Sequence, residues 1–253
     1  MKLSKIEKAV LSLSITLAIF LATPLSASAM HIMEGYLPLA HSIAWGAVCI
    51  PFLVVGVMRL RRIVAENKRA LILLAMSGAF IFVISSLKIP SVTGSCRHMT
   101  GTGLSAILFG IGTTSILAII VLIFQSILLA HGGLTTLGAN TFSMGIIGPI
   151  LTVILYKAGK KLKLNKMVNI FLAAALGDLF TYCVTSVQLA LAHPSETGGV
   201  GASLVKFLTV FAPTQIPLAI VEGLLTVLVI IGMEHFAASE LSEISYYATK
   251  EAK

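Results

Sequence analysis

Long apolar runs separated by short polar or basic segments dominate this chain. Beyond residue 40 the runs cover 41–60, 71–87, 104–130, 140–156, 167–192 and 204–233. A helix of about 20 apolar residues is long enough to cross the roughly 30 Å hydrocarbon core of a bilayer. The pattern therefore predicts an all-α polytopic membrane protein, and we find no soluble domain, tandem repeat or low-complexity segment in it.

Composition agrees with a membrane protein. The 253 residues are 57% hydrophobic and 11% charged, whereas soluble domains are about 45–50% apolar and about 25% charged. The net charge of +8 comes from Lys and Arg that gather between the apolar runs, so membrane topology explains it. We expect no nucleic acid as a partner, because no basic surface interleaved with aromatic residues is evident.

The first 29 residues have the order of a secretory signal. Lys2, Lys5 and Lys8 precede an apolar run over 9–21, and Ala27-Ser28-Ala29 closes the segment. A basic start, a short apolar core and an A-x-A end define a cleaved signal peptide. We predict a signal peptide over 1–29, with the uncleaved first transmembrane helix as the alternative, and export places the mature amino terminus outside.

Two basic clusters set the predicted topology, because cytoplasmic loops carry an excess of Lys and Arg. The first lies at 59–69 and the second at 157–166. If 104–130 crossed the membrane once, the second cluster would lie outside. A break at Gly110–Thr114 removes the conflict, giving a short helix over 100–110 and a full span over 113–130.

The predicted fold then has seven mature transmembrane helices, one of them short. The amino terminus is outside and the carboxyl terminus is cytoplasmic, with a transmembrane domain over 30–239 and a charged tail over 240–253. The last span is expected to be interrupted at Ala212–Thr214 and at Pro217. A short helix cannot cross alone, so the loop 88–99 before it must dip into the protein. That loop carries His98.

The new amino terminus would have specific coordination chemistry. If cleavage frees Met30, its amine, the amide nitrogen of His31 and the His31 Nδ1 close adjacent five- and six-membered chelate rings on one ion. A fourth nitrogen from His98 would complete a square, which suits Ni²⁺, Cu²⁺ and related late divalent ions and not Mg²⁺ or Ca²⁺. The alternative is that His31 is an ordinary surface residue near a new terminus.

The sequence leaves the roles of several other polar residues open. His131 is expected to hydrogen-bond within its Gly-rich turn, and Cys96 is a conceivable thiolate ligand near His98. Asp178 and Glu222 lie inside apolar runs, where ionisable residues are usually functional. For these two, an interhelical hydrogen bond and a role in ion passage or partner contact stay equally open.

Catalytic motifs of common enzyme classes are absent. The chain contains no GxxxxGK[ST] phosphate loop, no GxSxG and no HExxH. A metal-dependent membrane enzyme would need an open coordination position and a general base, for which Glu34 is the nearest carboxylate in sequence. We therefore expect a protein that is not an enzyme.

Three segments carry a resemblance to a known family. They are 30–38 (MHIMEGYLP), 85–90 (SSLKIP) with Gly94, Ser95 and His98, and 130–140 (AHGGLTTLGAN). In these the chain resembles the CbiM/NikM family, the substrate-capture subunits of energy-coupling-factor (ECF) metal importers. The resemblance implies a subunit of the bacterial cytoplasmic (inner) membrane that captures Co²⁺ outside to supply cobalamin biosynthesis. It implies Met30, His31 and His98 as ligands, and Ni²⁺ remains the alternative ion.

The resemblance also implies partners. They are a CbiQ-like transmembrane coupling subunit, a CbiO-like ATPase subunit and a CbiN-like small membrane subunit, all within the lipid bilayer or attached to it. ATP hydrolysis on a separate subunit agrees with the lack of a phosphate loop here. An uncoupled channel, which would move metal without an ATPase, is the remaining transport alternative.

The amine ligand depends on where the signal is cut. Because the A-x-A pattern ends at Ala29, mass spectrometry of the purified mature chain should find Met30 at the amino terminus. A mature chain that retains Ala29 would remove the amine from the ligand set and leave His31 as an internal residue.

Overall fold

The structure, a computed structural model, describes residues 31–87, 89–90 and 96–244. It is helical apart from one short antiparallel strand pair, in which Ile89 pairs with Arg97 and Pro90 with Cys96. The elements in chain order are α2 (Leu39–Glu66), α3 (Ala70–Ser86), β1 (Ile89–Pro90), β2 (Cys96–Arg97), α4 (Thr102–Phe109), α5 (Ile111–Leu128), α6 (Leu137–Asn140), the π-helix η1 (Thr141–Ile147), α7 (Gly148–Lys161), α8 (Lys166–Ala192), α9 (Gly199–Phe236) and α10 (Ala238–Glu243).

The long apolar run after residue 100 is two helices, as predicted from the charge conflict. Gly110 separates α4 from α5 with φ 80°, a backbone conformation that glycine adopts without a steric cost. The eight residues of α4 are all buried, and a helix of that length spans only about 12 Å. The short helix therefore lies inside the protein.

A helix covers each of the seven segments predicted to lie in the membrane. Within the described residues, five helical stretches are long and apolar enough to cross a bilayer, and α3 is a shorter apolar helix of 17 residues. Many large apolar side chains on these helices are exposed, such as Ile127 at 64% and Leu228 at 66%. Such surfaces face lipid or other protein. That all seven helices cross the membrane stays a prediction.

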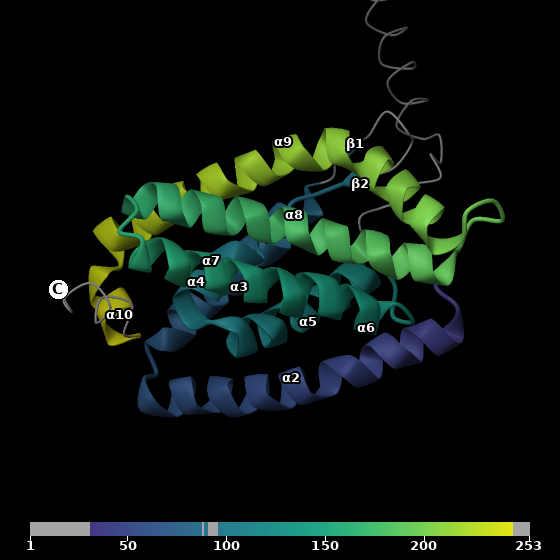
Figure 1. Cartoon of the computed structure of the whole chain (residues 1–253). Coiled ribbons are helices and arrows are strands. Elements are labelled where there is room, and N and C mark those ends of the chain that lie inside the picture. Colours follow the sequence, from purple (N-terminus) through teal and green to yellow (C-terminus); the bar gives the residue numbers. More distant parts are fainter. Residues whose placement is uncertain (1–30, 88, 91–95, 245–253) are drawn as a thin grey trace, which may run out of the picture.

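The predicted interruption of the last span was wrong. Helix α9 runs without a break over 38 residues, with Pro213 and Pro217 inside it. Proline removes a backbone hydrogen bond and bends a helix, and Figure 1 shows α9 bending near its middle. Neighbouring helices help to satisfy the backbone groups that proline frees within apolar surroundings, so the helix continues.

Helices α7 and α8 pack through paired glycines and threonines. A Cβ on Gly177 would lie 2.0 Å from Thr152 Oγ1, and one on Gly148 would lie 2.1 Å from Thr181 Oγ1. Each helix thus offers a glycine to the threonine of the other. Small residues at such positions let helix backbones approach closely where water does not drive association.

Basic residues gather at one end of the helix bundle. Figure 1 shows α10 toward this end, and toward the other end it shows the start of α2 together with β2 and α6. The basic clusters at the end of α2 and between α7 and α8 lie toward the α10 end. They therefore share one end of the molecule, as the predicted topology requires.

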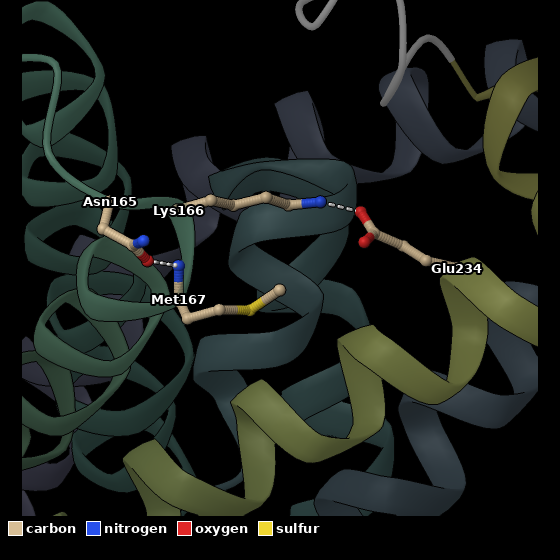
Figure 2. A network of polar contacts seen from close by, with 4 residues as sticks. All are labelled: Asn165, Lys166, Met167 and Glu234. Atoms are coloured by element: carbon tan, nitrogen blue, oxygen red, sulfur yellow. Dashed lines mark hydrogen bonds and ion pairs between the residues drawn. The ribbon is translucent and has the colours of Figure 1, made fainter.

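The loop between α7 and α8 is joined to the end of α9. The Asn165 side chain caps α8 by accepting a hydrogen bond from the Met167 amide at 2.9 Å, and Lys166 forms an ion pair with Glu234 (Figure 2). Glu234 near the end of α9 is thus paired. This contact closes the α8–α9 hairpin at the basic end of the bundle.

The glycine–threonine packing of α7 on α8 generates a stability prediction. Gly177→Ala places a methyl group against Thr152 and should lower the free energy of unfolding by about 1–3 kcal/mol, the usual cost of overpacking. The melting temperature of the purified protein in detergent should fall accordingly. Adding Thr152→Ala should recover most of the loss, and Gly232→Ala, where a Cβ meets nothing within 4 Å, should cause no loss and can add up to about 1 kcal/mol through helix propensity. A melting temperature unchanged by Gly177→Ala would contradict this packing.

Candidate metal centre

Three histidines from separate parts of the chain meet at the end of the bundle away from the basic clusters. His31 precedes α2, His98 follows β2, and His131 follows α5, and all three are buried, with 2%, 0% and 3% of their surface exposed. One nitrogen of each lies within 4.8 Å of the others. Two nitrogens bound to one ion at about 2.1 Å are at most about 4.2 Å apart, so small side-chain shifts bring all three into contact with a single ion.

The ring of His98 is oriented by its own backbone. Nδ1 lies 2.8 Å from the carbonyl oxygen of Met99, and because a carbonyl only accepts, Nδ1 carries the proton. The lone pair that binds metal is therefore on Nε2. A histidine ligand typically donates its other N–H in this way, which fixes the tautomer and the ring orientation.

The ring of His31 is oriented from η1. Its Nε2 lies 3.2 Å from the thioether sulfur of Met144, a weak acceptor, so Nδ1 is left as the metal-binding nitrogen. Nδ1 is the atom that a chelate through the amino terminus requires. Met144 lies in the π-helical turn, a kind of turn that often occurs at functional sites.

His131 is placed by the end of α5. Its amide donates to the carbonyl of Gln125 at 3.1 Å, and the Gln125 side chain donates to Ser85 in α3 at 2.6 Å. The imidazole is nearly perpendicular to those of His31 and His98, with interplanar angles of 72° and 74°. It approaches edge-on, beside a tilted pair of rings whose centroids are 4.4 Å apart.

We call residues 31–38 the strap, and the loop with α6 over 131–140 holds it. The Ile32 amide donates to Asn140 Oδ1 at 2.9 Å. The Ile32 carbonyl accepts from Asn140 Nδ2 at 3.0 Å and from Thr136 Oγ1 at 2.6 Å. Both side chains are buried, so the peptide groups on either side of Ile32 are fixed directly after His31.

Glu34 extends this contact. Its amide donates to the Gly132 carbonyl at 3.2 Å, and its carboxylate accepts from the Thr135 amide at 3.2 Å. Hydrogen bonds from Thr135, chiefly from its side chain, hold the pKa of Glu34 below its ordinary value. A Cβ on Gly133 would lie 2.6 Å from the Glu34 Cα, so only glycine allows this approach. Glu34 therefore helps to hold the strap.

The sequence predictions for the site have mixed outcomes. His31 and His98 lie together, but Met30 and the signal-peptide cut lie outside the described residues, as does the side chain of Cys96. His131 was expected to hydrogen-bond within its Gly-rich turn, and the structure places its ring beside the other two. The predicted topology placed all three histidines on the outer side. That shared side is the sequence signal that could have grouped His131 with His31 and His98.

His193 serves a loop at the same end of the bundle. His193 lies 2.8 Å, through Nε2, from the carbonyl oxygen of Tyr36. This contact ties the α8–α9 loop to the strap.

Comparison with known proteins identifies the family and the fold. The CbiM family, described as "Cobalt uptake substrate-specific transmembrane region", matches residues 31–239. This chain belongs to the CbiM family. A "Cobalt transport protein CbiM" of Lachnoclostridium phytofermentans is 61% identical over 242 residues, covering 96% of this chain and 97% of the relative. A protein of the same name from Chlorobium limicola is 58% identical over 243 residues, or 95% of each chain.

A solved structure has the same fold. The crystal structure of a truncated transition metal transporter superposes with a TM-score of 0.70 at 27% identity, covering 81% of this chain and 99% of the other. The relatives carry the names of transport proteins. The chain is accordingly a transporter component and not an enzyme.

The strap contact gives a prediction about local stability. Gly133→Ala pushes a methyl group against the Glu34 backbone and should loosen the strap, because that backbone must move away. Amide hydrogen exchange at Ile32 and Glu34 should become at least about tenfold faster, as expected for losing about 1.4 kcal/mol of local hydrogen bonding. Gly201→Ala, which meets nothing within 4 Å, should leave both rates unchanged. Unchanged rates in Gly133→Ala would show that the strap is held elsewhere.

Proposed function

We propose that this protein captures Co²⁺ at the extracellular face of the bacterial cytoplasmic membrane, as the substrate-binding subunit of an ATP-driven ECF-type importer that supplies cobalamin biosynthesis. The observation that carries the proposal is the convergence of three buried imidazoles at the end of the bundle opposite both basic clusters. The names of the relatives support cobalt as the cargo.

The proposed ligand set combines the terminus with the cluster. Cleavage after the signal peptide, residues 1–29, makes Met30 the first residue of a transmembrane domain over 30–239. The Met30 amine, the His31 amide and the His31 Nδ1 then chelate the ion, and His98 Nε2 binds from the loop before α4. The tautomers fixed by Met144 and Met99 support these two atoms.

His131 is proposed as an additional nitrogen donor. Its ring is nearly perpendicular to the other two, so it approaches from a different direction. A donor beyond the square plane disfavours the square-planar arrangement typical of Ni²⁺. This position therefore favours Co²⁺ over Ni²⁺ as the cargo.

The ion enters from the outer face and moves inward by the work of other subunits. A CbiQ-like coupling subunit, a CbiO-like ATPase and a CbiN-like small membrane subunit are the proposed partners. The orientation, with the cytoplasmic tail over 240–253, is supported by the position of α10 at the basic end. The bilayer surrounds the seven predicted helices.

Equilibrium binding of Co²⁺ and Ni²⁺ to the purified chain tests the site. His31→Ala and His98→Ala should each lose more than about 100-fold in Co²⁺ affinity, beyond the roughly 10–100-fold that loss of an outer-sphere contact costs. His131→Ala should lose at least about tenfold and should weaken Co²⁺ more than Ni²⁺.

The matched control is His235→Ala, a histidine near the far end of α9 whose ring contacts Phe236 and whose loss should leave wild-type affinity. Unchanged affinity in His98→Ala would overturn the proposed site. Tighter binding of Ni²⁺ than Co²⁺ by the wild type would make nickel the cargo.

A further inference from the structure

Two buried carboxyl groups lie near the metal centre but supply none of its proposed ligands. Asp178 of α8 is 1% exposed and Glu222 of α9 is 0% exposed. An ionisable side chain in the apolar interior of a membrane protein is costly and persists where it has a specific partner. Both carboxyl groups have the same partner, Thr100, two residues after His98.

Thr100 donates to both carboxyl groups. Its amide nitrogen lies 2.7 Å from Glu222 Oε2 and 3.2 Å from Asp178 Oδ1. Its hydroxyl donates to Glu222 at 2.9 Å. The Gln215 side chain in turn donates to Asp178 Oδ2 at 2.6 Å. Two long helices therefore position the acceptors for one residue of the loop.

The amide of Thr100 and the carbonyl of Met99 belong to one peptide group. That carbonyl accepts from His98 Nδ1 at 2.8 Å. A trans peptide is planar, and its N–H and C=O point in opposite directions. The carboxyl groups thus accept from the N–H side of this rigid peptide group, and the imidazole of His98 donates to its C=O side. Hydrogen bonds in such a chain also polarise and strengthen one another.

We infer that Asp178 and Glu222 are positioning residues for His98, acting through the Met99–Thr100 peptide. A metal-binding histidine often donates directly to a carboxylate, and loss of that outer contact costs about 10–100-fold in affinity. Here one peptide group is interposed between the two. The inference rests on the proposed function, because it assigns these residues a role in the same metal centre.

This arrangement joins the metal centre to the α8–α9 hairpin. Because the acceptors come from different helices, a relative shift of α8 and α9 alters the orientation of the Met99–Thr100 peptide and with it the His98 ring. The hairpin can thereby change the affinity of the site without touching the ion.

The test measures the affinity and the visible absorption spectrum of bound Co²⁺ in the purified full chain. Glu222→Gln replaces one acceptor oxygen with an amide nitrogen, and Thr100→Val removes the hydroxyl while keeping the backbone. Each should weaken binding by about 10–100-fold and shift the spectrum toward that of His98→Ala. Thr100→Ser, which keeps the hydroxyl, should restore both. Thr226→Val, buried one turn further along α9, should match the wild type.

Combination with His98→Ala separates positioning from general support. If Glu222 acts through His98, adding Glu222→Gln to His98→Ala should cause no further loss of the residual affinity. An additive loss, or a wild-type spectrum in Thr100→Val, would overturn the inference. If Glu222→Gln lowers the melting temperature so far that the protein is not folded, Thr100→Val and Thr100→Ser allow the same comparison of affinity and spectrum with a smaller change to the protein.

The two hypotheses fail in different ways. If His98→Ala binds Co²⁺ like the wild type, the proposed function itself is wrong. If His98→Ala loses binding while Glu222→Gln and Thr100→Val retain both affinity and spectrum, only the positioning role is wrong.

Discussion

The hydrogen bonds from Thr136 and Asn140 to Ile32 are the contact on which the metal centre depends. If the chain is cut before Met30 as proposed, this segment lies near a terminus and has little structure of its own, and fixing the backbone of one residue costs about 1–2 kcal/mol. Three hydrogen bonds to the backbone of Ile32 and two more at Glu34 offset that cost. They place His31 inside the protein. A mobile terminus would instead expose it to solvent.

Burial of irregular backbone is the second constraint. Within an apolar bundle, each backbone polar group outside a helix needs a partner in the protein. The loop at Met99 and Thr100 meets this need through the ring of His98 on one side and the carboxyl groups of Asp178 and Glu222 on the other. The same hydrogen bonds that permit the loop at this depth therefore also orient the ring of His98, a proposed metal ligand.

Much of the fold could be predicted because the signals are local or additive. The length of the run over 104–130, the glycines near 110 and the two basic clusters were enough to predict the short α4, and His98 and Met99 before it are buried as expected of a dipping loop. Continuity of α9 through Pro213 and Pro217 could not be predicted, because it depends on packing that a proline rule does not include. The seven crossings, the orientation and the cut before Met30 remain predictions.

The site was predicted in part for similar reasons. His31 and His98 were identified by the chelate chemistry of a terminus and by the need for a dipping loop. His131 was missed because its role depends on how the end of α5 is turned toward the strap by Gln125 and Gly132, which is a tertiary effect. The partnership of Asp178 and Glu222 is also tertiary, since 44 residues separate them in sequence and only the α8–α9 packing brings both to Thr100.

These contacts divide the three histidines into two groups. His31 and His131 are joined to each other, because the strap and the loop 131–140 share most of their hydrogen bonds. His98 is joined instead to α8 and α9 through Thr100. An ion bound to all three would bridge the two groups, so binding would favour their approach and their separation would weaken binding. Separating the two groups would also have to break the His193–Tyr36 contact and the packing of Ile32 and Leu37 on α8 and α9, which hold the strap to the same hairpin.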